Sequence, residues 1–123
     1  MKKNYSLLFI LVLTTFFCFT NKDVFSATYY SRTTGLWGTA STWSTAGCGG
    51  AAAASSPGAG DIVFICGPDV VTVAADVTTM NLTIQNGGYM LMGSTGGGAN
   101  KEVTITGTFT IDAPIMNNKI GIG

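Results

Sequence analysis

Apolar and polar residues alternate along most of the chain after residue 60. The alternation is clearest in residues 102–111, where aliphatic residues, one aromatic residue and one glycine alternate with four threonines. Residues 62–66 are instead apolar at every position, which is typical of a strand buried on both faces. A two-residue period and many β-branched side chains favour strands over helices. We therefore predict an all-β fold for residues 61–123.

The predicted strands recur at regular spacing. One set of apolar pairs has steps of 20, 21 and 17 residues, and a second set has steps of 19 and 19. A parallel β-solenoid requires such spacing, because each coil returns the same face to the core one strand spacing, about 4.8 Å, further along. The first set is Ile62/Phe64, Leu82/Ile84, Val103/Ile105 and Ile120/Ile122, and the second is Val71/Val73, Met90/Met92 and Phe109/Ile111.

An antiparallel β-sandwich is the alternative architecture. It also gives turn signals every 8 to 12 residues, and Asn86-Gly87 between two predicted strands is a tight-hairpin signal. The other connections lack two-residue hairpin signals. The spacing therefore favours a parallel β-helix over the sandwich.

Residues 1–26 have the three parts of a secretory signal peptide. Two lysines follow Met1, and Val24 and Ser26 suit a cleavage site. Between them, a thirteen-residue apolar stretch from Leu7 to Phe19 is interrupted only by Thr14 and Thr15. A membrane span needs about 20 apolar residues, so the stretch is short for an anchor. We predict cleavage after Ser26, with cleavage after Ala27 as the alternative. The prediction is a secreted or outer-cell-surface protein without a membrane span after cleavage.

Residues 27–60 predict an N-terminal cap and loop. Trp37 and Trp43 lie in a stretch rich in Thr, Ser and Gly, which does not suit an amphipathic helix. We interpret them as aromatic residues that cover the end of the core, and an exposed sugar-stacking pair is the alternative. Residues 45–60 are mostly Gly, Ala and Ser and predict a surface loop.

Cysteine usage predicts one disulfide. Cys18 leaves with the signal peptide, so Cys48 and Cys66 remain. Two cysteines in an exported chain most simply form a bridge. Two thiolates without histidine are insufficient for a closed zinc site. The bridge would hold both ends of the predicted loop.

Composition narrows the function classes. Six basic and six acidic residues balance, which removes the electrostatic case for nucleic acid. The chain has no histidine, which excludes Ser-His-Asp and Cys-His catalysis. The aspartates lack calcium-loop spacing and suit turns. We therefore predict no catalytic residue, no metal site and no cofactor within this sequence.

The threonines of residues 102–111 are the most suggestive surface. Regularly spaced hydroxyls on a flat strand are a candidate ligand face for sugar or ordered water, although threonine is also an ordinary exposed strand residue. With the two tryptophans, the candidate ligand residues are Trp37, Trp43, Thr104, Thr106, Thr108 and Thr110.

Five short motifs lie between residues 27 and 63. They are Ala27-Thr28-Tyr29-Tyr30-Ser31-Arg32, Gly35-Leu36-Trp37, Thr42-Trp43-Ser44, Gly47-Cys48-Gly49-Gly50 and Gly60-Asp61-Ile62-Val63. Together they resemble the mature start of large bacterial proteins secreted by the type IX system, whose opening region is similar to glycine-rich, pectate-lyase-like β-helix domains. The resemblance covers residues 27–84. It implies a right-handed β-helix, an outer-membrane or extracellular destination and a far longer chain. No C-terminal sorting domain is recognisable, and the chain ends within a predicted strand, so we expect a fragment.

These patterns favour a non-enzymatic extracellular module, structural or adhesive, built from the N-terminal coils of a right-handed parallel β-helix. Its expected partners are extracellular polysaccharide or cell-surface components. One alternative is the N-terminal part of a polysaccharide-acting β-helix enzyme whose catalytic residues lie beyond Gly123. Another is a small carbohydrate- or ice-binding protein that uses the threonine face. The expected organisation is signal peptide 1–26, cap and loop 27–60, and β-helix coils 61–123.

Overall fold

The computed structural model describes residues 25–93, 100–112 and 120–122. Over these residues the chain is all-β apart from one short 3-10 helix, so the predicted class is confirmed. The elements are β1 (Thr28–Ser31), β2 (Gly35–Leu36), η1 (Ala40–Thr42), β3 (Trp43–Ser44), β4 (Ile62–Ile65), β5 (Val70–Val73), β6 (Val77–Thr79), β7 (Asn81–Ile84), β8 (Tyr89–Met92), β9 (Val103–Ile105), β10 (Phe109–Ile111) and β11 (Ile120–Ile122). Most of the predicted signal peptide lies outside the described residues.

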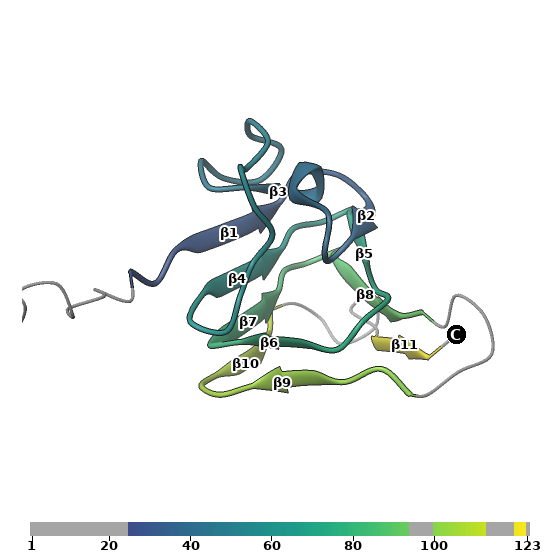
Figure 1. Cartoon of the computed structure of the whole chain (residues 1–123). Coiled ribbons are helices and arrows are strands. Elements are labelled where there is room, and N and C mark those ends of the chain that lie inside the picture. Colours follow the sequence, from purple (N-terminus) through teal and green to yellow (C-terminus); the bar gives the residue numbers. More distant parts are fainter. Residues whose placement is uncertain (1–24, 94–99, 113–119, 123) are drawn as a thin grey trace, which may run out of the picture.

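The strands form three sheets. Their orders are β10-β7-β4-β1-β3, β11-β8-β5-β2 and β6-β9. From β4 to β9 the chain visits the three sheets in turn, and Figure 1 shows the strands of the first sheet following one another down the molecule. We call one such passage, β4-β5-β6 or β7-β8-β9, a coil. Among the described strands every ladder is parallel except β1–β3, which excludes an antiparallel sandwich.

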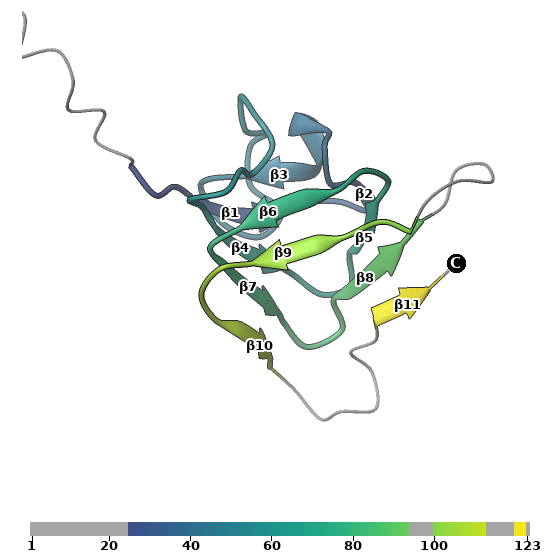
Figure 2. The same cartoon turned by 60° about the horizontal axis from the view of Figure 1, so that its bottom comes forward.

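One core lies between the three sheets (Figure 2). Alternate residues of β4, β5 and β7 point inward and are fully buried, whereas their neighbours are only partly buried. The parallel register stacks Val63 on Leu82 and Val71 on Met90. Burying one such aliphatic side chain contributes about 1.5–3 kcal/mol. Successive coils therefore share a column of apolar contacts.

The prediction of which β4 residues point into the core is wrong, with a shift of one residue along the strand. Val63 and Ile65 are 0% exposed, whereas Ile62 and Phe64 are partly buried on the other face. The Phe64 ring stacks there on Tyr30, with centroids 5.1 Å apart. Because every residue of β4 is apolar, the sequence contains no alternation that could show which side faces the core.

Residues 102–111 are not one strand. They form β9 and β10, which belong to different sheets. The chain turns between them, where the Gly107 amide donates to the carbonyl oxygen of Met80 at 2.8 Å and the Thr108 amide donates to Oδ1 of Asn81 at 2.8 Å. A Cβ atom on Gly107 would collide with that same Oδ1, so glycine suits this corner.

The separation of β9 from β10 changes the two predicted sets of stacked strands. β9 stacks on β6, not on β7, and β10 stacks on β7, not on β8. The last strand, β11, stacks on β8. The two predicted sets were therefore wrong for these three strands. Each coil contains a third strand, and the alternating segment that forms β6 was too short to be predicted as a separate strand.

Glycines allow the corners of successive coils to approach closely. A Cβ atom on Gly88 would lie 2.5 Å from the carbonyl oxygen of Ile65, and one on Gly67 would collide with the carbonyl oxygen of Asn86. Gly87 has a φ of +82°, which favours glycine. Asn86-Gly87 thus forms a corner between two sheets and not a hairpin.

The N-terminal end of the stack is closed. β3 pairs antiparallel with β1, and η1, β3 and the loop of residues 45–60 gather at the end opposite β10 (Figure 1). Arg32 fastens this loop, since its Nε donates to the carbonyl oxygen of Gly50 at 2.7 Å. β1 and β2 already pair with β4 and β5, so stacking starts within the segment predicted as cap. We call η1, β3 and residues 45–60 the cap.

Candidate functional site

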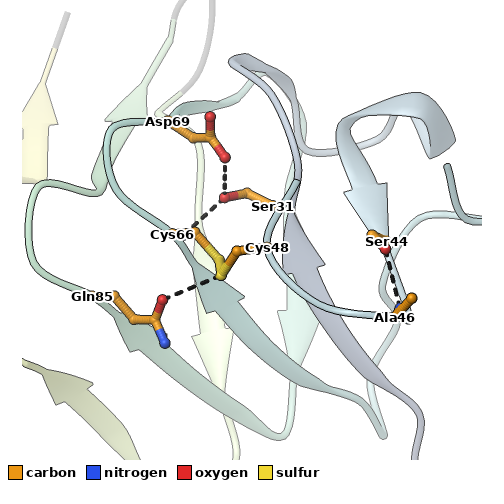
Figure 3. The surroundings of a disulfide bond; sticks show 7 residues. All are labelled: Ser31, Ser44, Ala46, Cys48, Cys66, Asp69 and Gln85. Atoms are coloured by element: carbon orange, nitrogen blue, oxygen red, sulfur yellow. Dashed lines mark hydrogen bonds between the residues drawn. A yellow bond between two sulfur atoms is a disulfide. The ribbon is translucent and has the colours of Figure 1, made fainter. Parts of the chain in front are cut away.

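The predicted disulfide between Cys48 and Cys66 is confirmed, with Cα atoms 5.9 Å apart. This separation is in the usual range for a bridge. Cys66 follows β4 and is 2% exposed, whereas Cys48 lies on the exposed part of the cap. The bridge therefore joins the cap to the first full coil (Figure 3).

A small polar network lies beside the bridge. The Ser31 hydroxyl donates to Oδ2 of Asp69 at 2.6 Å and accepts the Cys66 amide at 2.8 Å. Ser31 is fully buried, and Figure 3 shows it between the other two residues. The hydroxyl proton and one lone pair are thus both engaged. The arrangement positions the corner after β4 and engages the Ser31 hydroxyl, so Ser31 is not a free nucleophile.

Gln85 lies on the other side of the bridge. Its Oε1 atom is 3.4 Å from Sγ of Cys48 (Figure 3). A bridged sulfur carries no proton, so this is a polar contact and not a hydrogen bond from a thiol. Through it the second coil also touches the cap.

The two tryptophans belong to the core. Trp37 is 1% exposed and Trp43 is 0% exposed, and their rings meet edge to face with centroids 5.1 Å apart. Trp43 Nε1 donates to the carbonyl oxygen of Trp37 at 2.6 Å. The interpretation as a cover over the core fits this placement, and neither ring is accessible for stacking on a sugar.

The four threonines are exposed, but they do not form one face. Thr104 lies on β9 and Thr110 on β10, in different sheets, and Thr106 and Thr108 occupy the corner between them. The Thr104 hydroxyl donates to Oε1 of Glu102 at 2.9 Å. The flat ladder expected of a regular ligand surface is therefore interrupted at the corner.

The carboxylates are dispersed. Asp61 binds the amides of Ala27 and Gly58, and Oδ1 of Asp76 accepts the Glu102 amide at 3.0 Å. No group of three or more potential metal ligands occurs in the part of the chain that the structure describes. Asp61 and Asp76 therefore fix the positions of backbone segments.

One shallow apolar cavity of about 260 Å³ lies beside the cap, between residues 36–39 and the connection from β5 to β6. Its lining includes Trp37, Ala75 and Val77 and contains no titratable side chain. Nε1 of Trp37 is buried without a hydrogen-bond partner. The cavity therefore offers an apolar surface without an acidic or basic side chain.

Comparison with protein-family models, with curated proteins and with solved structures found no match. Over the described residues, no helix is both long and apolar enough to cross a membrane. The site that the geometry defines best is therefore the bridge between the cap and the first coil. The sequence revealed its two cysteines, but no local pattern revealed Ser31, which meets Asp69 across 38 positions.

Proposed function

We propose that this chain is a non-enzymatic structural module of an exported protein, in which a disulfide-fastened cap closes the first coil of a right-handed parallel β-helix. The observation that carries this proposal is the cap itself. β3 ends the first sheet with an antiparallel pair, and the Cys48–Cys66 bridge fastens the adjoining loop to the end of β4.

Three sheets and their parallel ladders support the β-helix. The chain passes from β4 to β5 to β6 and then returns beside β4 as β7, and each return is parallel. Parallel crossovers are right-handed in nearly all proteins, which supports the proposed hand. The resemblance of residues 27–84 to type IX-secreted β-helix proteins agrees with the same architecture.

A covered strand at the N-terminal end of the stack prevents unwanted pairing with other molecules. The outermost strand of a parallel stack presents unpaired amides and carbonyls, which pair readily with strands of other molecules. In this chain β3 occupies the edge of β1 in the first sheet. Solenoid proteins need such terminal caps for solubility. The cap therefore protects this edge of the first sheet from edge-to-edge association.

Export is supported by two independent features. Residues 1–26 have the composition of a signal peptide. A disulfide persists mainly in oxidising compartments such as the periplasm and the extracellular space. The proposed location is the cell surface or the medium, where a stack stabilised by backbone pairing and one bridge serves as scaffold.

The capping role is tested by removing the disulfide that fastens the cap. The full chain is expressed with export in a Gram-negative host, and wild type is compared with Cys48→Ser and with the control Ala46→Ser, an exposed substitution in the same loop. We expect wild type and control to be monomeric by light scattering, and Cys48→Ser to associate as concentration rises, with faster amide exchange in β1. An exported Cys48→Ser protein that stays monomeric with unchanged exchange in β1 would contradict the capping role.

A further inference from the structure

Ala27 is the first residue that the fold holds. Its amide donates to Oδ1 of Asp61 at 3.0 Å, and its carbonyl oxygen accepts the Ile62 amide at 2.9 Å. The Ala27 side chain is partly buried against the core. The ladder between β1 and β4 therefore extends back to this residue.

The two residues before Ala27 lie outside the fold. Phe25 is 91% exposed and Ser26 is also exposed. No hydrogen bond joins either of them to the described part of the chain. The boundary between free and held backbone thus falls at the Ser26–Ala27 peptide bond.

Hydrogen bonds hold Asp61 in position beside the backbone nitrogen of Ala27. Its Oδ2 accepts the Gly58 amide at 2.8 Å. Its carbonyl oxygen accepts the Met80 amide at 2.9 Å and the Thr79 hydroxyl at 2.7 Å, which ties the residue to the junction between the first and second coils. The carboxylate is therefore fixed before any new group arrives, and binding there needs little reordering.

We propose that the Ser26–Ala27 bond is the processing site of the exported chain, and that the Asp61 carboxylate binds the α-ammonium group that processing creates on Ala27. This inference rests on the proposed export. A signal peptidase adds water across the bond, so that Ser26 leaves with a new carboxylate and the nitrogen of Ala27 becomes a primary amine. The amine is protonated at neutral pH.

Processing converts a neutral hydrogen bond into an ion pair at the same place. Before cleavage an amide N–H faces Oδ1, and after cleavage a positive charge does. Charge-assisted hydrogen bonds are shorter and about twice as strong as neutral ones. Cleavage one residue later would remove both backbone bonds of Ala27 and leave Oδ1 without this partner. Removal of the leader therefore strengthens the start of β1.

The position of cleavage is tested on the full chain expressed with export in a Gram-negative host. Intact mass and N-terminal sequencing of the exported protein should show that it begins at Ala27. A chain that is exported and cleaved but begins elsewhere overturns this inference and leaves export intact. A chain that keeps residues 1–26 and stays inside the cell overturns the export proposal itself.

The ion pair is tested by selective acetylation of the α-amine of the mature protein, which restores an uncharged amide N–H. Acetylation should raise the equilibrium constant for unfolding about twofold to fivefold in wild type. The effect should vanish in Asp61→Asn and persist in the control Asp76→Asn, whose carboxylate serves a different corner. An equal effect in Asp61→Asn and wild type contradicts the proposal.

A salt titration of wild type gives a second measurement that needs no variant. The stability difference between the free and the acetylated protein should shrink as ionic strength rises, because salt screens a partly exposed ion pair. A difference that is absent at low salt, or that salt leaves unchanged, contradicts the ion pair even where Asp61→Asn does not fold.

Discussion

Single glycines set how closely one coil stacks on the next. Gly88 is buried at the corner between β7 and β8, directly against the backbone of Ile65 in the coil above. Backbone atoms cannot move aside as the end of a long side chain can. The spacing of the coils at this corner therefore depends on the missing Cβ atom.

Gly88→Ala should destabilise the protein by about 1–3 kcal/mol, the usual cost of forcing an extra carbon into a packed site. The matched control is Gly38→Ala, since a Cβ atom there would meet nothing within 4 Å. Urea unfolding followed by tryptophan fluorescence measures both. Equal stability of Gly88→Ala and wild type would show that the corners do not stack this closely.

The strands differ in how far the sequence could predict them. β5 and β7 alternate, and their buried residues Val71, Leu82 and Ile84 were predicted. β4 is apolar throughout, so its register is decided by pairing with β7, which no local pattern encodes. The threonine alternation continues through the corner at residues 106–108, so the sequence alone joined β9 and β10 into one strand.

The candidate site was predictable to the same limited extent. Counting cysteines after removal of the leader was sufficient to pair Cys48 with Cys66. The contacts that surround the bridge were not predictable, because Ser31, Asp69 and Gln85 come from three strand ends or corners that are distant in sequence. Only the parallel stacking brings them together.

Loss of the bridge should weaken the cap more than the coils. Cys48→Ser leaves Cys66 as a buried thiol, which packs as a small apolar group. We expect the free energy that holds the cap closed to fall by about 2–5 kcal/mol, the usual effect of removing a native bridge from a small secreted domain. Hydrogen exchange should rise in residues 45–60 and change little in β7 and β8. An equal loss of protection from hydrogen exchange in all strands would show that the bridge stabilises the whole core and not mainly the cap.

The two ends of the molecule differ. At the N-terminal end the cap covers β1, whereas at the other end β10 is the outermost strand of its sheet and Phe109 and Ile111 are 41% and 42% exposed. Between these ends the side chains in each column face the same environment, so coils of the same shape can repeat. This difference between the ends agrees with the proposed role of a module at the start of a stack.

The chain folds as parallel coils, in which each strand lies beside the corresponding strand one coil away. Nuclear magnetic resonance of the labelled, exported protein tests it through scalar couplings across hydrogen bonds. Parallel stacking should give couplings from the Gln85 amide to the Ile65 carbonyl and from the Gly93 amide to the Val73 carbonyl, whose nitrogen and oxygen atoms are 2.9 and 3.1 Å apart. Couplings that instead join β7 to β8 in an antiparallel ladder across Asn86-Gly87 would contradict the parallel stack and the function built on it.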